Sequence, residues 1–365
     1  MFGSRTAWVF GLLVLAGLGS GCGEREKEVH RPLVSPDGGS VVEVVEIDGK
    51  QAVIRDGEQV GEKHDKVLSR VWSPDGRSLA VIAKDGGKYS VVRDGVAVGK
   101  PVTNVTAPIF SPDSKSLAFV ASSAGGVGVI RDGEPVGGWF PHVGPPAFSP
   151  DGESLVFAAQ VGKKMFVAQD GKPTGTGYDR ILYPGFTPDG QSIVCVGVTN
   201  DVSFVVKDGR KVSGGYERVW GWAVSADGQS LAFLARRDGQ DVLVKDRTEV
   251  GEPFAADEVA GPVFAPDGRS VGFAAGRGTW FLRKDETQLG GAFQAGGVRQ
   301  VLFSPDGKSL ACSVIQRRRA FVVKDGERVS EIYRAVSDLK NSADGRNLVF
   351  RGVRGKKTEN VSVSW

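Results

Sequence analysis

The sequence predicts an all-β protein, a closed β-propeller of eight to nine four-stranded antiparallel blades, from two recurring turns and an absence of helical periodicity. The first turn is Ser-Pro-Asp-Gly or a close variant, and its aspartate recurs every 38 to 40 residues along the 365-residue chain. A period near 40 residues with β-type content is typical of propeller blades. The nine turn aspartates are Asp37, Asp75, Asp113, Asp151, Asp189, Asp227, Asp267, Asp306 and Asp344.

A second turn, Asp-Gly, follows the first by 18 or 19 residues in most units, as in "VIRDG" at 53–57 and "VVKDG" at 322–326. Asp-Gly between short apolar stretches predicts a two-residue hairpin, because both central residues of a type I′ turn need positive φ. Asp246-Arg247 and Asp285-Glu286 depart from this pattern, and there we expect a different or looser turn.

The sequence pattern of each repeat unit predicts four strands. The first precedes the Ser-Pro-Asp-Gly turn and carries a large ring, as in "PIFS" at 108–111. The second, such as "SLAFVA" at 116–121, is apolar on both faces, which suits a strand packed between neighbouring layers. The third strand leads into Asp-Gly, and the fourth is a short segment after it.

The number of blades depends on how the two ends of the repeat region meet. Nine turns favour nine blades, although the ninth unit, 339–365, supplies only the first three strands. We expect the segment before Arg31, "REKEVH", to add the missing outer strand and close the ring. The alternative is that the terminal pieces merge into eight blades.

The N-terminus predicts export and lipidation. Residues 1–21 have the pattern of a signal peptide, with Arg5 followed by an apolar run that is too short to span a bilayer comfortably. Cys22 follows small residues and resembles the lipidated cysteine of a bacterial lipobox. We therefore expect a lipid anchor at Cys22, a tether over 22–30 and the propeller over 31–365. The alternatives are a plain secretory signal with an incidental cysteine, or an uncleaved anchor.

The repeat pattern "xPxFSPDGxSLAFxA…VVxDG" is similar to the WD-type repeats of TolB-like bacterial β-propellers. It resembles more closely a variant in uncharacterised bacterial exported proteins, whose units carry a tail like "YDRI" at 178–181 and "YERV" at 216–219. The resemblance covers 31–365 and implies a ring of blades used as an interaction platform. Together with the anchor, it implies a membrane-attached lipoprotein that faces the periplasm or the cell surface.

The antiparallel strand order predicts which face carries function. Both turn types share one face, and the loops between second and third strands lie on the other, where sequence varies most. In blades six to nine these loops are basic, and they predict one charged sector for an acidic protein, an anionic polymer or lipid headgroups. The alternative is a solvated rim. The candidate residues are Arg236, Arg237, Arg277, Arg317, Arg318, Arg319, Arg351, Arg354, Lys356 and Lys357.

The remaining composition offers little for chemistry. The three histidines lack metal-ligand spacing, and no Cys-x-x-Cys or nucleophile elbow occurs, so we expect no catalytic, metal or cofactor site. The net charge of +3 is too small to predict a nucleic-acid partner. We expect a monomeric, non-catalytic scaffold for protein or polymer interactions in the cell envelope. The alternatives are a small-ligand sensor that uses the central channel, or a propeller lyase or hydrolase.

Overall fold

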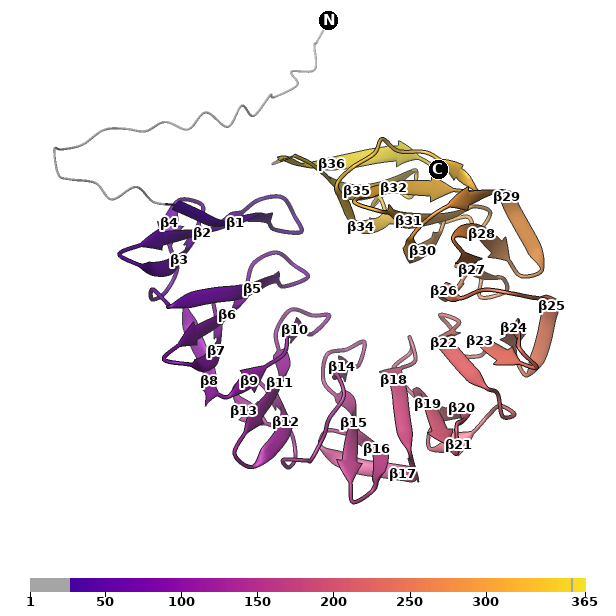
Figure 1. Ribbon diagram of the computed structural model, residues 1–365, viewed down its shortest axis with the longest axis horizontal. Coiled ribbons are helices and arrows are strands. Elements are labelled where there is room, and N and C mark those ends of the chain that lie inside the picture. The colour runs from indigo at the N-terminus through magenta and orange to yellow at the C-terminus, as the bar shows by residue number, and fades with distance from the viewer. Residues whose placement is uncertain (1–26, 356) are drawn as a thin grey trace, which may run out of the picture.

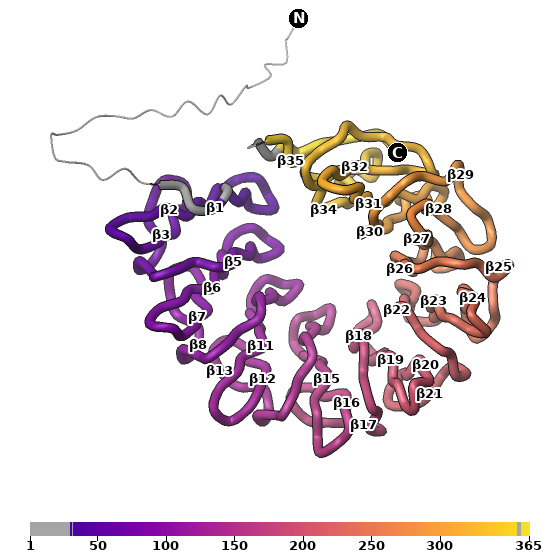
Figure 2. The backbone as a smooth tube through the Cα atoms, viewed as in Figure 1, coloured from indigo at the N-terminus to yellow at the C-terminus, as the bar shows by residue number. Residues whose placement is uncertain are grey.

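The computed structural model describes residues 27–355 and 357–365 and contains nine antiparallel sheets arranged radially around a ring, as Figures 1 and 2 show. No helix occurs in these two ranges. The predicted all-β propeller is confirmed, and the count of nine blades is confirmed over eight. The first strand of each blade lies nearest the centre of the ring and the last strand lies at the outside.

The first four blades have the expected strand order, and only blade three adds a short extra strand. Blade one is β1 (Lys27–Val34), β2 (Val41–Ile47), β3 (Lys50–Arg55) and β4 (Glu58–Gln59); blade two is β5 (Lys66–Trp72), β6 (Leu79–Asp85), β7 (Lys88–Arg93) and β8 (Val96–Val102); blade three is β9 (Asn104–Val105), β10 (Ile109–Phe110), β11 (Leu117–Ser123), β12 (Gly126–Arg131) and β13 (Glu134–Pro135); blade four is β14 (Ala147–Phe148), β15 (Leu155–Val161), β16 (Lys164–Gln169) and β17 (Lys172–Tyr178).

Blades five to eight have four strands each, and blade nine has three. Blade five is β18 (Arg180–Phe186), β19 (Ile193–Thr199), β20 (Val202–Lys207) and β21 (Arg210–Lys211); blade six is β22 (Arg218–Val224), β23 (Leu231–Arg237), β24 (Gln240–Lys245) and β25 (Thr248–Phe254); blade seven is β26 (Glu258–Phe264), β27 (Val271–Arg277), β28 (Thr279–Lys284) and β29 (Thr287–Gln294); blade eight is β30 (Gly297–Phe303), β31 (Leu310–Gln316), β32 (Arg319–Lys324) and β33 (Glu327–Arg328); blade nine is β34 (Ala335–Asn341), β35 (Asn347–Arg354) and β36 (Lys357–Ser364).

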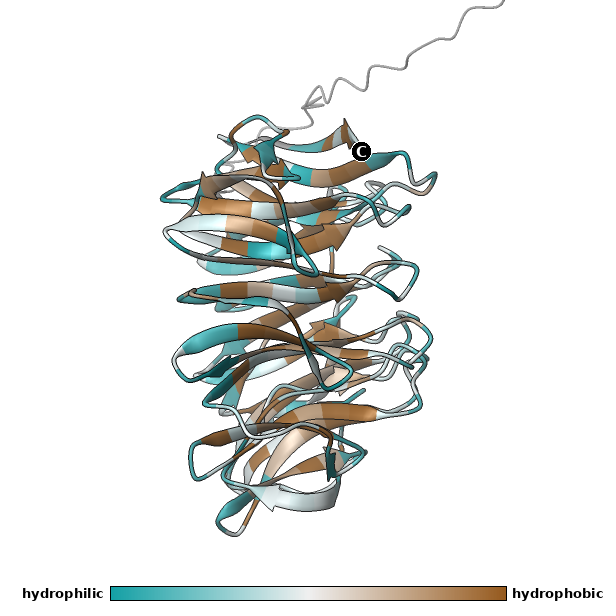
Figure 3. Ribbon diagram, turned by 90° about the vertical axis from the view of Figure 1, so that its right-hand side faces the viewer, coloured by the Kyte–Doolittle hydropathy of each residue, from teal (hydrophilic) through white to brown (hydrophobic). Residues whose placement is uncertain are grey.

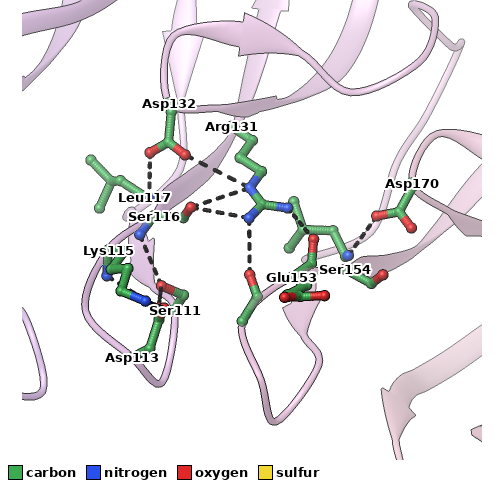
Figure 4. Close-up of polar contacts among 12 residues, drawn as sticks. Ser111, Asp113, Lys115, Ser116, Leu117, Arg131, Asp132, Glu153, Ser154 and Asp170 are labelled. Atoms are coloured by element: carbon green, nitrogen blue, oxygen red, sulfur yellow. Dashed lines mark hydrogen bonds and ion pairs between the residues drawn. The ribbon is translucent and has the colours of Figure 1, made fainter. Parts of the chain in front are cut away.

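The aspartate of the Ser-Pro-Asp-Gly turn closes its own hairpin. In blade three, Oδ1 of Asp113 accepts hydrogen bonds from the Ser111 hydroxyl at 2.5 Å and from the Lys115 amide at 3.2 Å (Figure 4). The Ser111 hydroxyl also accepts the amide of Ser116 at 2.9 Å. These bonds lower the pKa of Asp113 to about 2, chiefly through the Ser111 hydroxyl. The turn carboxylate is therefore engaged in shaping the loop.

The aspartate of the second turn has a different partner. Oδ1 of Asp132 accepts the amide of Leu117, the first residue of β11, at 2.8 Å. The same bond, to the first residue of the second strand, occurs in blades one to eight. Each Asp-Gly-type turn thus ties the end of the third strand to the start of the second.

A cation before this turn connects each of several blades to the next. Arg131 in blade three donates to the carbonyl oxygens of Gly152 and Glu153 in blade four (Figure 4). Its guanidinium also lies 5.5 Å from the centre of the Phe148 ring. Equivalent contacts are made by Arg55, Arg93, Lys245 and Lys284. We call this the inter-blade cation contact.

Apolar side chains fill the space between consecutive blades, and Figure 3 shows the hydrophobic colour along the middle of the strands. An aromatic residue at the crossing between blades packs against a phenylalanine in the second strand of the following blade. Tyr216 meets Phe233 edge-on with ring centroids 5.5 Å apart, and Tyr333 meets Phe350 at 5.9 Å. Because polar turns lie at both ends of these apolar strands, the blades stack through their faces.

The two ends of the repeat region meet differently from the prediction. Residues 27–30 extend β1, the innermost strand of blade one, where Lys27 pairs with Glu46. The predicted outer strand for blade nine is therefore wrong, and strand structure begins four residues before the expected start at residue 31. The cause is that β2 is long enough to pair with the chain ahead of Arg31 as well as behind it.

Candidate functional site

The predicted basic sector lies on the loops between the second and third strands of blades six to nine, and its residues have unequal surroundings. Arg317 and Arg318 join β31 to β32, and Arg319 begins β32. Lys356 lies outside the described residues, as does the side chain of Lys357.

Arg236 belongs to the interior of blade six. It forms two hydrogen bonds with the carboxylate of Asp241, at 2.9 and 2.8 Å, and a third with the carbonyl oxygen of Ala256. Asp241 is fully buried and also accepts from the Trp220 indole at 3.3 Å. Because a buried carboxylate needs its cation, Arg236 has a structural role in blade six, and its part in a binding surface stays a prediction.

Arg351 holds the ring together. Its guanidinium donates to the carbonyl oxygens of Val34 at 2.9 Å and Ser35 at 2.7 Å in blade one, and it lies 3.3 Å from Asp338 in blade nine. Its side chain is only 16% exposed. All three nitrogens of the guanidinium are engaged, so Arg351 has a structural role, and its part in the binding surface stays a prediction. We call this junction of blades nine and one the ring seam.

Arg237, Arg277 and Arg354 remain on the surface, but each has an acidic neighbour. Arg237 lies 2.6 Å from Glu249, Arg277 lies 2.5 Å from Asp257, and Arg354 lies 3.8 Å from Glu331. Exposed pairs of this kind are weak and leave the cation available to a competing anion. These three arginines are therefore partly neutralised members of the sector.

Arg317, Arg318 and Arg319 are the unpaired part of the sector. All three are exposed, and within the described structure they form no hydrogen bond or ion pair through their side chains. Arg317 has a φ of 57°, which places it in the tight turn between β31 and β32. Three adjacent guanidinium groups without an acidic partner thus lie together at one hairpin tip.

Arg334 adds to this surface and escaped sequence reasoning. It lies between β33 and β34, its side chain is exposed, and its amide donates to the carbonyl oxygen of Val353 beside the basic loop of blade nine. The prediction considered only loops between second and third strands, whereas the crossing from one blade to the next reaches the same face. A tally of cations on both loop types would have found Arg334.

An open cavity of about 650 Å³ lies at the ring seam. Its walls come from the innermost strands of blades one, two, eight and nine and from β35 and β36. Trp72 and Phe350 give it apolar surface, while Arg70, Gln300 and Lys340 give it polar groups. This volume and mixed lining suit a small amphipathic molecule.

The cysteines and the possible metal ligands are the other groups that could carry chemistry. The thiols of Cys195 and Cys312 are buried and free, and burial raises the pKa of Cys195 to about 12. In the part of the chain that the structure describes, no three histidine, cysteine or carboxylate groups gather as a metal site would require. Nor does any helix with the length and hydropathy of a membrane span occur in residues 27–355 and 357–365. Cys22 and the predicted signal peptide lie outside the described residues.

These features define the class of protein: the chain is a nine-bladed β-propeller with a basic hairpin on one face and a cavity at the ring seam. No family model and no curated protein matches the sequence. A solved structure described as "Structure of Dos1 propeller" is similar with a TM-score of 0.45 and 11% identity, covering 82% of this chain and 92% of that chain. The assignment of the fold depends on the nine radial sheets themselves.

Proposed function

We propose that the protein is a non-catalytic propeller scaffold, anchored to a bacterial membrane through Cys22, that binds an anionic protein or polymer of the cell envelope. The observation that carries the proposal is the β31–β32 hairpin, where Arg317, Arg318 and Arg319 are exposed and unpaired. Arg334 extends the charge to the neighbouring crossing. The opposite face supports this choice, because its turn carboxylates are occupied by hydroxyls and amides of their own loops.

The binding surface is tested by reversing its charge. Arg317, Arg318 and Arg319 are changed together to Glu, and the full chain is titrated with polyglutamate and sedimented with phosphatidylglycerol vesicles. We expect the variant to bind polyglutamate about tenfold more weakly or worse, with a loss that shrinks as salt rises.

The control reverses three exposed cations on the turn face, Lys172, Arg210 and Arg346, which changes the net charge equally. It should bind as the unaltered chain does. Equal losses in both variants would mean that net charge alone drives binding. Unchanged binding in the first variant would show that the hairpin is only a solvated rim. If the first variant lost binding to vesicles but kept binding to polyglutamate, the partner would be a lipid surface and not a polymer or protein.

The anchor is tested separately. Cys22→Ala should move the protein from the membrane fraction to the soluble fraction of exporting bacteria, because a single thioether-linked lipid group would no longer form. Cys195→Ala, at a buried thiol, is the matched control and should leave the distribution unchanged. Retention of the Cys22 variant in the membrane would favour an uncleaved signal anchor.

The seam cavity favours a second candidate function, the binding of a small ligand at the channel side of the ring. Val349 lines the cavity and is partly buried, so Val349→Phe would reduce the space without removing a charge. Fluorescence of anilinonaphthalene sulfonate should rise with the unaltered chain and rise less with the variant. Equal fluorescence with both chains would show that the dye binds outside the seam cavity, which would contradict this second candidate function.

A further inference from the structure

The Asp-Gly-type turn of blade six differs from its equivalents in one residue. Arg247 occupies the second central position, with a φ of 71°, where six other turns have glycine. The looser turn expected there is wrong: Asp246 has a φ of 48° and Lys245 pairs with Thr248 across two residues. Left-handed backbone is unfavourable for a residue with a Cβ, so the turn keeps its geometry at a cost in strain.

The neighbouring blade also departs from the repeat at this junction. At most other junctions a glycine after the fourth strand's start faces the turn glycine of the next blade, and a Cβ on Gly137 would lie 2.6 Å from Cα of Gly171. At the junction of blades six and seven, Gly251 faces Glu286 instead. In blade five the fourth-strand position is Ser213, whose hydroxyl accepts the Val205 amide at 2.9 Å. Both glycines of the usual pair are thus replaced at this junction, by Ser213 and Arg247.

Two adjoining hollows open at this place, one of about 300 Å³ and one of about 240 Å³. They share the lining residues Val212, Phe233 and Arg247. Lys211 lines the first hollow and Lys207 lines the second. We call these two spaces the junction hollows. They lie between blades five and six and are distinct from the basic hairpin and from the ring seam.

The cations of the junction hollows have few competing acids. Within the described residues, Arg247 forms no hydrogen bond or ion pair through its side chain. Lys207 has the position from which Arg131 reaches the next blade, yet it donates no hydrogen bond to blade six in the described structure. The Lys211 ammonium lies 3.6 Å from the centre of the Phe204 ring, which leaves its hydrogen-bond donors free.

One carboxylate lines the hollows, and it is already used. Oδ1 of Asp246 accepts the amide of Leu231 at 2.9 Å, as its equivalents do in the other blades. Asp189, in the first turn of blade five, also lies near enough to Lys207 for the two charges to interact. The residues that line the hollows still carry three cations and one engaged carboxylate, so the concave space has a positive balance. A guanidinium offers paired N–H donors that match two oxygens of a phosphate or sulfate, and the ammoniums add point charges.

We propose that the junction hollows bind the phosphate or sulfate group of a small molecule, with Arg247 as the main ligand and Lys207 and Lys211 as supporting charges. Val212 and Phe233 offer apolar surface to the rest of that molecule. A concave site between two blades fits a small molecule better than a flat membrane surface does. The strained arginine is explained by this role, since glycine would serve the turn better.

The proposal is tested with a substitution that restores the repeat. The full chain and Arg247→Gly are titrated calorimetrically with sodium phosphate and sodium sulfate, and with sodium chloride at matched ionic strength. We expect phosphate and sulfate to bind the unaltered chain and to bind Arg247→Gly about tenfold more weakly. The melting temperature of Arg247→Gly without phosphate should equal or exceed that of the unaltered chain, because glycine adopts the left-handed conformation without strain.

Arg210→Gln is the matched control, because it removes one exposed charge from the neighbouring turn outside the hollows. It should bind phosphate as the unaltered chain does. Lys211→Met keeps an apolar contact with Phe204 and serves as a second binding variant if Arg247→Gly fails to fold. Equal heats from chloride and phosphate, or undiminished binding by Arg247→Gly, would overturn the proposal. Binding to phosphatidylglycerol vesicles without binding to phosphate would also overturn it, in favour of a lipid surface.

Discussion

At two junctions of the ring an arginine donates to backbone carbonyl oxygens of the next blade, but the apolar packing between the blades differs. Between blades three and four, Arg131 donates to turn carbonyls of the next blade while an apolar cluster that includes Val129 and Phe157 spans the two blades. At the ring seam, Arg351 also donates to carbonyl oxygens of the next blade, but no apolar cluster of the described residues joins blade nine to blade one. A cation supplements packing at the first junction and replaces it at the second.

The comparison predicts its largest effect at the seam. Arg351→Met removes both carbonyl contacts and the contact with Asp338, and nothing apolar compensates. We expect the free energy of unfolding to fall by about 3 kcal/mol, since hydrogen bonds from charged donors are the strong ones. Urea denaturation would measure this fall, and small-angle scattering would detect an opened ring.

Arg354→Met on the same strand is the control for Arg351→Met. Arg354 is exposed and its partner Glu331 is 3.8 Å away, so its loss should change stability by less than about 0.5 kcal/mol. A similar loss in both variants would show that Arg351 contributes only as a surface charge.

A smaller effect is expected from the close backbone contact between blades three and four. Gly137→Ala would place a Cβ 2.6 Å from Cα of Gly171, at a φ of 78°. We expect the free energy of unfolding to fall by about 2 kcal/mol, from the clash and the unfavourable conformation together. Gly138→Ala, at a position with open space around it, should change little in the same urea titration.

Removing the cation from the packed junction should cost less than removing it from the seam. Arg131→Met leaves the apolar cluster of blades three and four in place, and its carbonyl partners lie on a turn that water can reach. We expect a fall of about 1 kcal/mol in the free energy of unfolding. If the free energy of unfolding fell as much as in Arg351→Met, apolar packing would not compensate for the lost cation at this junction.

The smallest effect concerns the turn itself and its dependence on pH. The pKa of Asp113 is lowered to about 2 in the folded state, chiefly by the Ser111 hydroxyl, so the folded chain holds fewer protons than the unfolded chain between about pH 4 and pH 2. This contribution is present above the unfolded pKa and is lost as pH falls through the folded one. Asp113→Asn should therefore flatten the decline of stability that urea titrations measure across this range.

Blade seven offers the matched control for the pH experiment. Ala265 replaces the turn serine there, and the pKa of Asp267 is lowered chiefly by the Arg269 amide. Ala265→Ser should add a hydroxyl bond to Asp267 and slightly increase stability at neutral pH. A steeper decline in acid would accompany that gain, because the new bond also needs the charged carboxylate.

The sequence predicted the ring well because its first turn recurs nine times and its second turn eight times at a regular period, so that an error in one unit is corrected by the others. It predicted the seam poorly because nothing repeats there. Arg351 binds backbone carbonyls of Val34 and Ser35, more than three hundred residues away in the chain. Every residue has a backbone carbonyl, so the residue types at 34 and 35 do not indicate this contact. The structural role of Arg236 could not be predicted either, because its partner Asp241 is polar yet fully buried.

In the candidate sites, too, some features could be predicted from the repeat and others required the structure. Arg317 to Arg319 could be placed from the repeat, since the loop and its face follow from the strand order. The junction hollows could have been suspected from Arg247 at a glycine position, but Ser213 and the space beside it required the structure. Departures from a strict repeat are therefore the most informative residues in such a chain.

The inter-blade cation contacts all point the same way along the chain, from the third strand of one blade to the turn of the next. During synthesis, a blade that has just left the ribosome meets the cation of its predecessor, which is already in place. Assembly can thus proceed from the N-terminus in the order of translation, one blade at a time. Only the turn of blade one must wait until Arg351 has been made, so the last contact to form is the one that joins the oldest blade to the youngest.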